Sequence, residues 1–402
     1  MYYSKYWSLC LLKLSLVIFS SFTVEAQKFQ HWGSLIKGKY EVGYRDTVII
    51  NPNEDYSYYK YRDKKPFFIN IWYPAIDNPR KRFMKFGEYL IYDSKDQFPE
   101  LLDSVVNKYR NFLIRGAICK DSKDLKTVDY DRKHKKIFGR ILASTVPSKR
   151  NLLIVNGKHP AIFYHHGAQS IPMDNNTFCE YMASHGFVVI SSNYLWPTEN
   201  ERDMKSKNSI EDISFILSQF MSTKAIDKDR IVAAGHSWGG QQWMLYDTQS
   251  LKPFKEIIAW HTTLEPWDVE FAKKNWPNLL FAYENRSQLM TTPAIIFAPV
   301  CARGPRYMPF KENKHTPYLF VTVNNFEMNH DAFVSFGNLR APYATKYKLP
   351  DKDVLIHQNA CWERIVLFTQ SLINKALGEK DVSFDNLHAD SAFFRLSTYN
   401  IK

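Results

Sequence analysis

The distribution of apolar and polar residues changes character near residue 160. Beyond it, short apolar runs alternate with segments whose apolar residues recur every three or four positions. The runs are typical of strands buried in a parallel sheet, and the periodic segments are typical of helices with one buried face. The predicted strands are 161–164, 187–190, 230–234, 257–260, 294–298 and 318–323, and the predicted helices are 177–186, 210–221, 241–247 and 362–377. This alternation predicts an α/β fold with a mostly parallel central sheet and helices on both faces.

The first 160 residues are less regular. Apolar runs within 40–50 and 67–73 predict two more strands, and the Asn, Asp and Tyr residues at 51–65 predict a polar loop between them. Residues 79–150 interrupt the rhythm: they are partly helical around 100–114 and otherwise charged. We interpret 79–150 as an insertion and a candidate cap within one domain rather than as an independent domain.

Charge is concentrated in this insertion. The chain has a formal net charge of +12, and residues 79–150 hold 18 Lys and Arg against 9 Asp and Glu. A solvated charged surface is the first interpretation, and the alternative is a basic face in peripheral contact with an anionic lipid or polysaccharide surface. Basic and aromatic residues are not interleaved as in nucleic-acid sites, so no nucleic-acid partner is expected.

The N-terminus has the pattern of a secretory signal peptide. Lys5 precedes an apolar run at 9–22, and Val24-Glu25-Ala26 presents small residues at the two positions that signal peptidase reads. The run is short for a bilayer span of about 20 residues, which disfavours a retained anchor. We therefore predict cleavage after Ala26, a mature domain of residues 27–402, and a secreted or periplasmic location.

The cysteines do not indicate a metal site or a particular disulfide. Four cysteines follow the predicted signal peptide, and none are paired at the spacing of zinc ligands: Cys119, Cys179, Cys301 and Cys361. Cys179 and Cys361 fall in predicted helices and are expected to be buried thiols. Disulfide pairing stays open, and no metal or other cofactor is expected.

The strongest chemical signal is the sequence GHSWGG at Gly235–Gly240. It fits G-x-S-x-G between a predicted strand and a predicted helix. In that context a sharp turn exposes the serine hydroxyl, and small flanking residues leave room for the bend. Ser237 is therefore the predicted nucleophile, and the alternative is a glycine-rich turn without chemistry.

The order of elements predicts the partners of Ser237. In serine hydrolases built on such sheets the base follows the last strand, and His330 lies seven residues beyond Val323. The other candidate histidines lie before the nucleophile, before that strand, or close to the terminal helix: His165, His166, His315 and His357. The oxyanion hole is predicted from the backbone N–H of Trp238 and that of Ala168.

The chain resembles a branch of the α/β hydrolases that contains the platelet-activating-factor acetylhydrolases and dienelactone-hydrolase-like esterases. The segments that carry this resemblance are Tyr40–Arg45, Ile71–Ala75, His165–Gly167, Glu180–Val189, Asp229–Ile231 running into the elbow, and Asn329–Phe333. The resemblance implies the α/β-hydrolase fold and a metal-free serine esterase or lipase mechanism.

One position departs from the pattern of that branch. In members of that branch the triad aspartate ends the strand after the nucleophile helix, and this sequence has His261 at the corresponding position. Because a histidine cannot stabilise an imidazolium as an anion would, we predict Glu265 as the triad acid, with Asp268 as the next candidate. Glu327 is near His330 in sequence but on the wrong side for the usual geometry.

Two functions follow. The first is an exported serine esterase that hydrolyses a carboxylic ester, from a small molecule, lipid or polysaccharide, through an acyl-enzyme on Ser237. The second is a binding protein of the same fold that is weakly active or inactive because it lacks a normal triad acid. The retained serine, both glycines and His330 favour the enzyme.

Overall fold

The computed structural model describes residues 29–118, 132–199, 207–249, 252–262, 269–300, 316–325, 327–379 and 393–399. The predicted signal peptide lies outside these residues, as do Cys119, Cys301 and both carboxylates predicted for the triad, Glu265 and Asp268.

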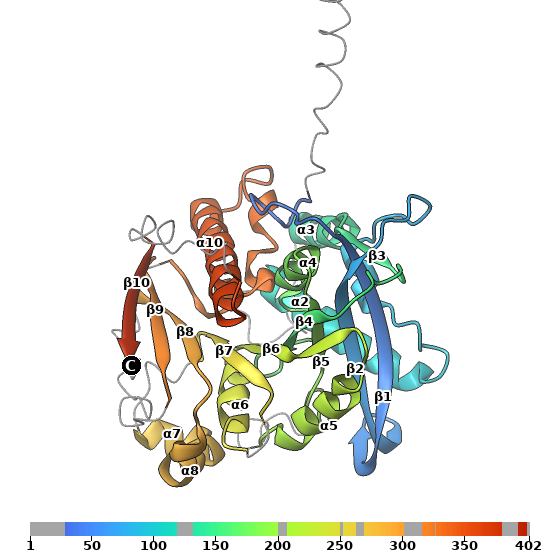
Figure 1. The fold of residues 1–402 in the computed structure, drawn as a ribbon. Helices are drawn as coiled ribbons and strands as arrows, with labels where there is room; N and C mark the ends of the chain where they lie inside the picture. The colour runs from blue at the N-terminus through green and yellow to red at the C-terminus, as the bar shows by residue number, and fades with distance from the viewer. Residues whose placement is uncertain are drawn as a thin grey trace, which may run out of the picture.

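A single twisted sheet of ten strands forms the centre of the described structure, in the order β10-β9-β8-β7-β6-β4-β5-β2-β1-β3 (Figure 1). From β5 to β9 along this order every neighbouring pair is parallel, and β2, β1 and β10 add antiparallel pairs at the two edges. The strands are β1 (Glu41–Tyr58), β2 (Tyr61–Ala75), β3 (Ser148–Arg150), β4 (His159–His165), β5 (Val188–Ser192), β6 (Ile226–His236), β7 (Phe254–Trp260), β8 (Ala294–Pro299), β9 (Tyr318–Val323) and β10 (Phe394–Tyr399).

Helices cover both faces of the sheet. In Figure 1 α4 and α10 lie above the central strands, and α5, α6 and α8 lie below them. The α-helices are α2 (Pro99–Ile118), α3 (Arg132–Ala143), α4 (Asn176–Ser184), α5 (Ile210–Met221), α6 (Trp238–Tyr246), α7 (Val269–Asn275), α8 (Pro277–Arg286) and α10 (Lys352–Ala376). Short 3₁₀ turns are η1 (Phe86–Leu90), η3 (Ser287–Leu289), η5 (His330–Phe333), η6 (Ser335–Asn338) and η7 (Ala341–Tyr343). The predicted mostly parallel sheet with helices on both faces is confirmed.

Strand alternation explains the two apolar layers. Successive side chains of a strand point to opposite faces, so on β6 Val232 and Ala234 join the core beneath α4 and α10. Ile231 and Ala233 join the core against α5, α6 and α8 instead. Because both faces are covered, β6 is apolar at successive positions, which is why the sequence shows a continuous run there.

The predicted polar loop at 51–65 is wrong. β1 and β2 pair across most of this segment as a long antiparallel hairpin that turns at Tyr59 and Lys60, with a register shift between Asn51 and Asp55. Tyrosines are frequent in strands, and the rings of Tyr56 and Tyr58 lie 6.4 Å apart. Packing of the tyrosine rings therefore stabilises the extended strands more than the Asn and Asp residues favour a turn.

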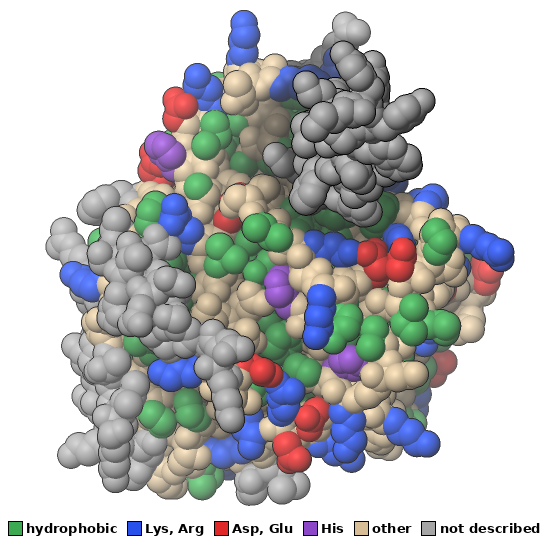
Figure 2. Space-filling model, turned by 45° about the horizontal axis from the view of Figure 1, so that its top comes forward, with side chains coloured by type: hydrophobic (Ala, Val, Ile, Leu, Met, Phe, Trp, Pro, Cys, Tyr) green, Lys and Arg blue, Asp and Glu red, His purple; other side chains and the backbone are tan. Residues whose placement is uncertain are grey.

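The insertion at 79–150 is tied to the sheet. It contains η1, α2 and α3 and ends as β3, which pairs in parallel with β1. Several of its cations are paired with carboxylates, including Arg82 with Glu88 and Arg150 with Asp93. On the face shown in Figure 2, Lys and Arg side chains are dispersed among acidic and apolar ones. The expected contact with an anionic surface stays a prediction.

Two further observations concern helices. Cys179 and Cys361 are buried, as predicted. Among the described residues we find no helix with the length and apolarity that a bilayer crossing requires.

Candidate active site

Ser237 occupies a strained turn between β6 and α6. Its backbone has φ of 54° and ψ of −123°, in a region that residues with a side chain seldom adopt. The flanking glycines are required sterically: a Cβ on Gly235 would lie 2.5 Å from the carbonyl carbon of Gly239, and a Cβ on Gly239 would lie 2.1 Å from the carbonyl oxygen of His165. The backbone N–H of Ser237 donates to Trp260 on β7 at 2.9 Å. The predicted elbow is therefore present in its strained form.

His330 lies opposite the Ser237 hydroxyl. It begins η5, the turn after β9, and its Nε2 is 2.9 Å from Ser237 Oγ. Asn329 holds this turn, because its side-chain oxygen accepts the backbone N–H groups of Asp331 and Ala332, each at 3.1 Å. A neutral Nε2 in this position can accept the proton of a serine hydroxyl.

A second histidine contacts the other nitrogen of His330. His261 directly follows β7, and its Nδ1 is 3.0 Å from His330 Nδ1. The predicted acids Glu265 and Asp268 lie outside the described residues. Glu327, which the sequence disfavours as the acid, pairs with the exposed His357 at 3.1 Å. Among the described residues, His261 thus occupies the place where a triad carboxylate was expected.

His236 completes a cluster of three rings around the nucleophile. Its Nε2 is 2.9 Å from the backbone carbonyl of His330, and because a carbonyl only accepts, His236 is the donor. We call His236, His261 and His330 the imidazole cluster. Burial is the main cause that lowers the pKa of all three, to about 3 for His261. The cluster is therefore uncharged at neutral pH.

The predicted oxyanion loop lies against the nucleophile. A Cβ on Gly167 would lie 3.2 Å from His236 Nδ1 and 3.3 Å from Ser237 Cβ, a tight contact that glycine avoids, and Ala168 follows directly. The buried ring of His166 contacts the carbonyl of Asn193 at 3.0 Å, in keeping with a bracing role. Trp238 is the first residue of α6, where backbone N–H groups are not used by the helix.

A family model described as chlorophyllase matches residues 123–245, which include the elbow. A search of curated proteins gives no match. A ferulic acid esterase from Streptomyces cinnamoneus superposes with a TM-score of 0.53 at 12% identity, over 85% of this chain and 92% of that one.

The chain has the α/β-hydrolase fold. Two other solved structures superpose on it less well. A DcsB complex with its substrate analogue has a TM-score of 0.36 at 12% identity, over 56% of this chain and 92% of that chain. A puromycin-hydrolyzing peptidase of Mycobacterium tuberculosis has a TM-score of 0.37 at 13% identity, over 57% of this chain and 36% of that chain.

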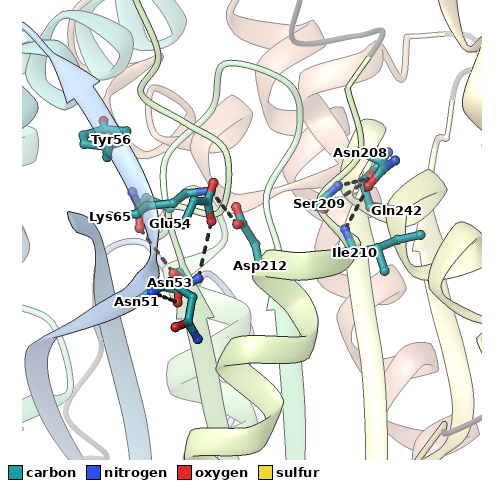
Figure 3. A network of polar contacts seen from close by, with 12 residues as sticks. Asn51, Asn53, Glu54, Tyr56, Lys65, Asn208, Ser209, Ile210, Asp212 and Gln242 are labelled. Carbon is teal, nitrogen blue, oxygen red and sulfur yellow. Dashed lines mark hydrogen bonds and ion pairs between the residues drawn. The ribbon is translucent and has the colours of Figure 1, made fainter. Parts of the chain in front are cut away.

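Behind the elbow of this hydrolase fold, polar contacts join α6 to its neighbours (Figure 3). Gln242 on α6 accepts the backbone N–H of Ser209 at 2.8 Å, and the Ser209 hydroxyl lies 2.9 Å from Nε2 of His165. These contacts fix the start of α5, the nucleophile helix and the end of β4 together. Sequence reasoning missed them because they join residues far apart in the chain.

Beside them, Lys65 lies between Glu54 and Asp212 (Figure 3). Its side chain is 4% exposed, its ammonium is 2.8 Å from Glu54, and the Asp212 carboxylate is also buried. We call Glu54, Lys65 and Asp212 the charged network. It anchors the β1–β2 hairpin on the start of α5.

The insertion reaches the active-site loops through α2. Phe112 stacks on Phe336 of η6 with ring centroids 4.7 Å apart, and Tyr109 stacks on Trp196 at 5.2 Å. Phe336 follows His330 by six residues, so α2 packs on the same loop as the predicted base. Within the described residues, no group of three or more His, Cys, Asp or Glu is arranged to hold a metal.

Proposed function

We propose that the protein is an exported serine esterase, with Ser237 as nucleophile and His330 as general base. The observation that carries the proposal is the 2.9 Å contact between Ser237 Oγ and His330 Nε2 at a strained elbow. The α/β-hydrolase fold supports it, and so does the chlorophyllase match across the elbow. Export rests on the sequence of the N-terminus alone.

The proposed reaction proceeds in two halves. As Ser237 Oγ attacks the ester carbonyl carbon, its proton moves to His330 Nε2 and the carbonyl oxygen becomes an oxyanion. Backbone N–H groups of Trp238 and Ala168 are the proposed donors to this oxyanion. The bond from carbon to the alcohol oxygen then breaks, and the alcohol takes the proton from Nε2. Water repeats these steps on the acyl-enzyme and releases the acid.

The substrate is proposed to be a carboxylic ester of a small molecule, lipid or polysaccharide. The stacking of α2 on the His330 loop supports the proposal that the insertion at 79–150 acts as a cap over the acyl group.

The test combines labelling with turnover. A fluorophosphonate probe should label the wild-type protein, and Ser237→Ala should abolish both labelling and hydrolysis of p-nitrophenyl esters from acetate to long acyl chains. Ser218→Ala, on the exposed side of α5, is the matched control. Full labelling of Ser237→Ala would move the nucleophile elsewhere, and an inert wild-type protein would favour the non-catalytic binding protein.

A further inference from the structure

The contact between His330 and His261 determines how both rings are protonated. If Nε2 of His330 accepts the serine proton, the proton of the neutral ring must sit on Nδ1. This Nδ1–H then donates across the 3.0 Å contact, so Nδ1 of His261 is the acceptor and Nε2 of His261 carries its proton. The arrangement has the connectivity of a triad with an imidazole in place of the carboxylate.

We infer that His261 is the third member of the triad, a neutral positioning residue that holds His330 in the reactive tautomer. The inference rests on the proposed function of Ser237 and His330 and deepens it. His261 acts through its Nδ1 lone pair rather than through a negative charge. It competes with Glu265, because Nδ1–H of His330 makes one good hydrogen bond.

The backbone conformation and the hydrogen bonds around His261 fix the position of its ring. Its φ is 43°, in the left-handed region where Asn, Asp and His are enriched among residues with a side chain. The backbone N–H of His261 donates to Phe297 on β8 at 2.7 Å, and the carbonyl of Thr262 accepts Gln241 of α6 at 2.6 Å. The ring of His261 also packs against Phe333 at 5.2 Å. These contacts with a strand, a helix and a loop therefore orient the ring toward His330.

Burial keeps this acceptor neutral. Desolvation and, as the smaller cause, the positive charge that His330 can acquire together lower the pKa of His261 to about 3. Around His330, neutral His261 and His236 supply no negative charge, and Asp331 on its own turn is the group that raises its pKa against the effect of burial. A base with a lowered pKa stays deprotonated in mild acid, so activity should persist below pH 6.5, the ordinary pKa of histidine.

Three substitutions of His261 separate positioning from packing. Asn and Asp suit a left-handed backbone, and either places an oxygen where His261 has Nδ1. Asn therefore retains a neutral acceptor, Asp adds a charge, and Ala removes the acceptor. Glu265→Gln tests the competing acid, and Glu270→Gln on the exposed start of α7 is the control. Thermal unfolding of each variant shows whether the fold is intact.

We expect His261→Ala to lower kcat by roughly 10- to 10³-fold, below the roughly 10⁴-fold cost of replacing a triad carboxylate. His261→Asn should restore most of this loss. In His261→Asp the carboxylate should favour the imidazolium, so the acidic limb of kcat/KM should move to higher pH by about one unit or more. A residue that only packs would not give the rescue by Asn.

Two outcomes would overturn the inference. One is near-normal turnover in a folded His261→Ala together with a loss of about 10³-fold or more in Glu265→Gln, which would assign the acid to Glu265. The other is a ¹⁵N NMR spectrum of Ser237→Ala, with labelled histidines, in which His330 carries its proton on Nε2. This spectrum needs no turnover, so it tests the histidine pair even if the wild-type protein fails to hydrolyse any ester.

Discussion

The imidazole cluster and the charged network are two buried polar regions of one molecule, held together by different physics. The charged network keeps Lys65 out of water by pairing it with two carboxylates. The imidazole cluster contains three titratable rings whose pKa values burial lowers, so they need no counter-ion. A buried charge that loses its partner is costly, whereas a neutral hydrogen bond contributes about 1 kcal/mol.

Because of this difference, we expect the charged network to contribute to stability and the imidazole cluster to contribute to catalysis. The charged network fixes the hairpin on α5 and takes no part in the proposed reaction. The imidazole cluster must receive and release a proton during every proposed catalytic cycle. Burial and the lack of a fixed negative charge disfavour the protonated ring, so His330 readily passes its proton on to the leaving group. Substitutions in the two regions should therefore give opposite phenotypes.

The largest expected effect is on catalysis. His330→Ala should lower ester hydrolysis by about 10⁴- to 10⁶-fold, because members of a triad act as a unit, and it should leave the urea midpoint almost unchanged. His357→Ala is the control, since this exposed ring pairs with Glu327. An active His330→Ala beside an inactive His357→Ala would transfer the role of base.

The next effect is on stability. Lys65→Met should lower the free energy of unfolding by about 3–5 kcal/mol at pH 8, because it leaves a buried charge unpaired. Lys64→Met should cost less than about 1 kcal/mol, since Lys64 pairs with the exposed Asp55. Urea titrations measure both, and kcat of the folded fraction should stay near that of the wild type. Equal losses in the two variants would show that burial of Lys65 is of no consequence.

The loss in Lys65→Met should depend on pH. Burial raises the pKa of Asp212 to about 6 even beside Lys65, above its value in the unfolded chain. A group whose pKa is raised by folding favours the folded state when protonated, and this contribution disappears as pH rises through the folded pKa. Without Lys65 the pKa should rise further, so the variant should be closest to the wild type near pH 4 and lose stability as pH increases above 6.

A smaller effect is expected within the imidazole cluster itself. His236→Ala removes the donor to the His330 carbonyl and should lower kcat about tenfold, the equivalent of about 1.4 kcal/mol. His236→Gln can place its amide nitrogen near the former Nε2 and should recover part of the rate. A loss as large as that of His330→Ala would show that His236 does more than hold the loop.

Much of the fold was predictable because its signals are local. The strands of the parallel sheet appear as short apolar runs, and the elbow residues are forced by close backbone contacts at Gly235 and Gly239. The outer part of the β1–β2 hairpin was missed because its Asn and Asp residues match a turn pattern, and because cross-strand pairs such as Asn51 with Lys65 join residues outside a local window. β10 was not predicted at all, since it forms by pairing with the distant β9.

Some residues of the candidate site were also predictable from the sequence, and others were not. Ser237 and His330 follow from a motif and from the order of elements, and the structure brings them within 2.9 Å. The position of His261 at the end of its strand was also evident from the sequence. The role that we propose for it was not, because the sequence pattern points to a negative charge there, and an imidazole lone pair accepts the same hydrogen bond without one. His236 gave no sequence signal beyond its place before the nucleophile.

The insertion connects the two regions and provides the smallest expected effect. On α2, Lys108 lies 5.5 Å from the ring centroid of Tyr58 in the hairpin that carries Glu54, and Phe112 stacks on Phe336 beyond His330. If α2 covers the acyl group, Phe112→Ala should lower kcat/KM for long-chain p-nitrophenyl esters by a few-fold, in line with a stack worth about 0.5–1.5 kcal/mol. Hydrolysis of p-nitrophenyl acetate should hardly change, because a short acyl group does not extend to α2.

Asn111→Ala, on the exposed side of α2, is the control. Equal losses for short and long esters would mean that α2 positions the His330 loop rather than the substrate, and would join the insertion to the imidazole cluster as part of one catalytic unit.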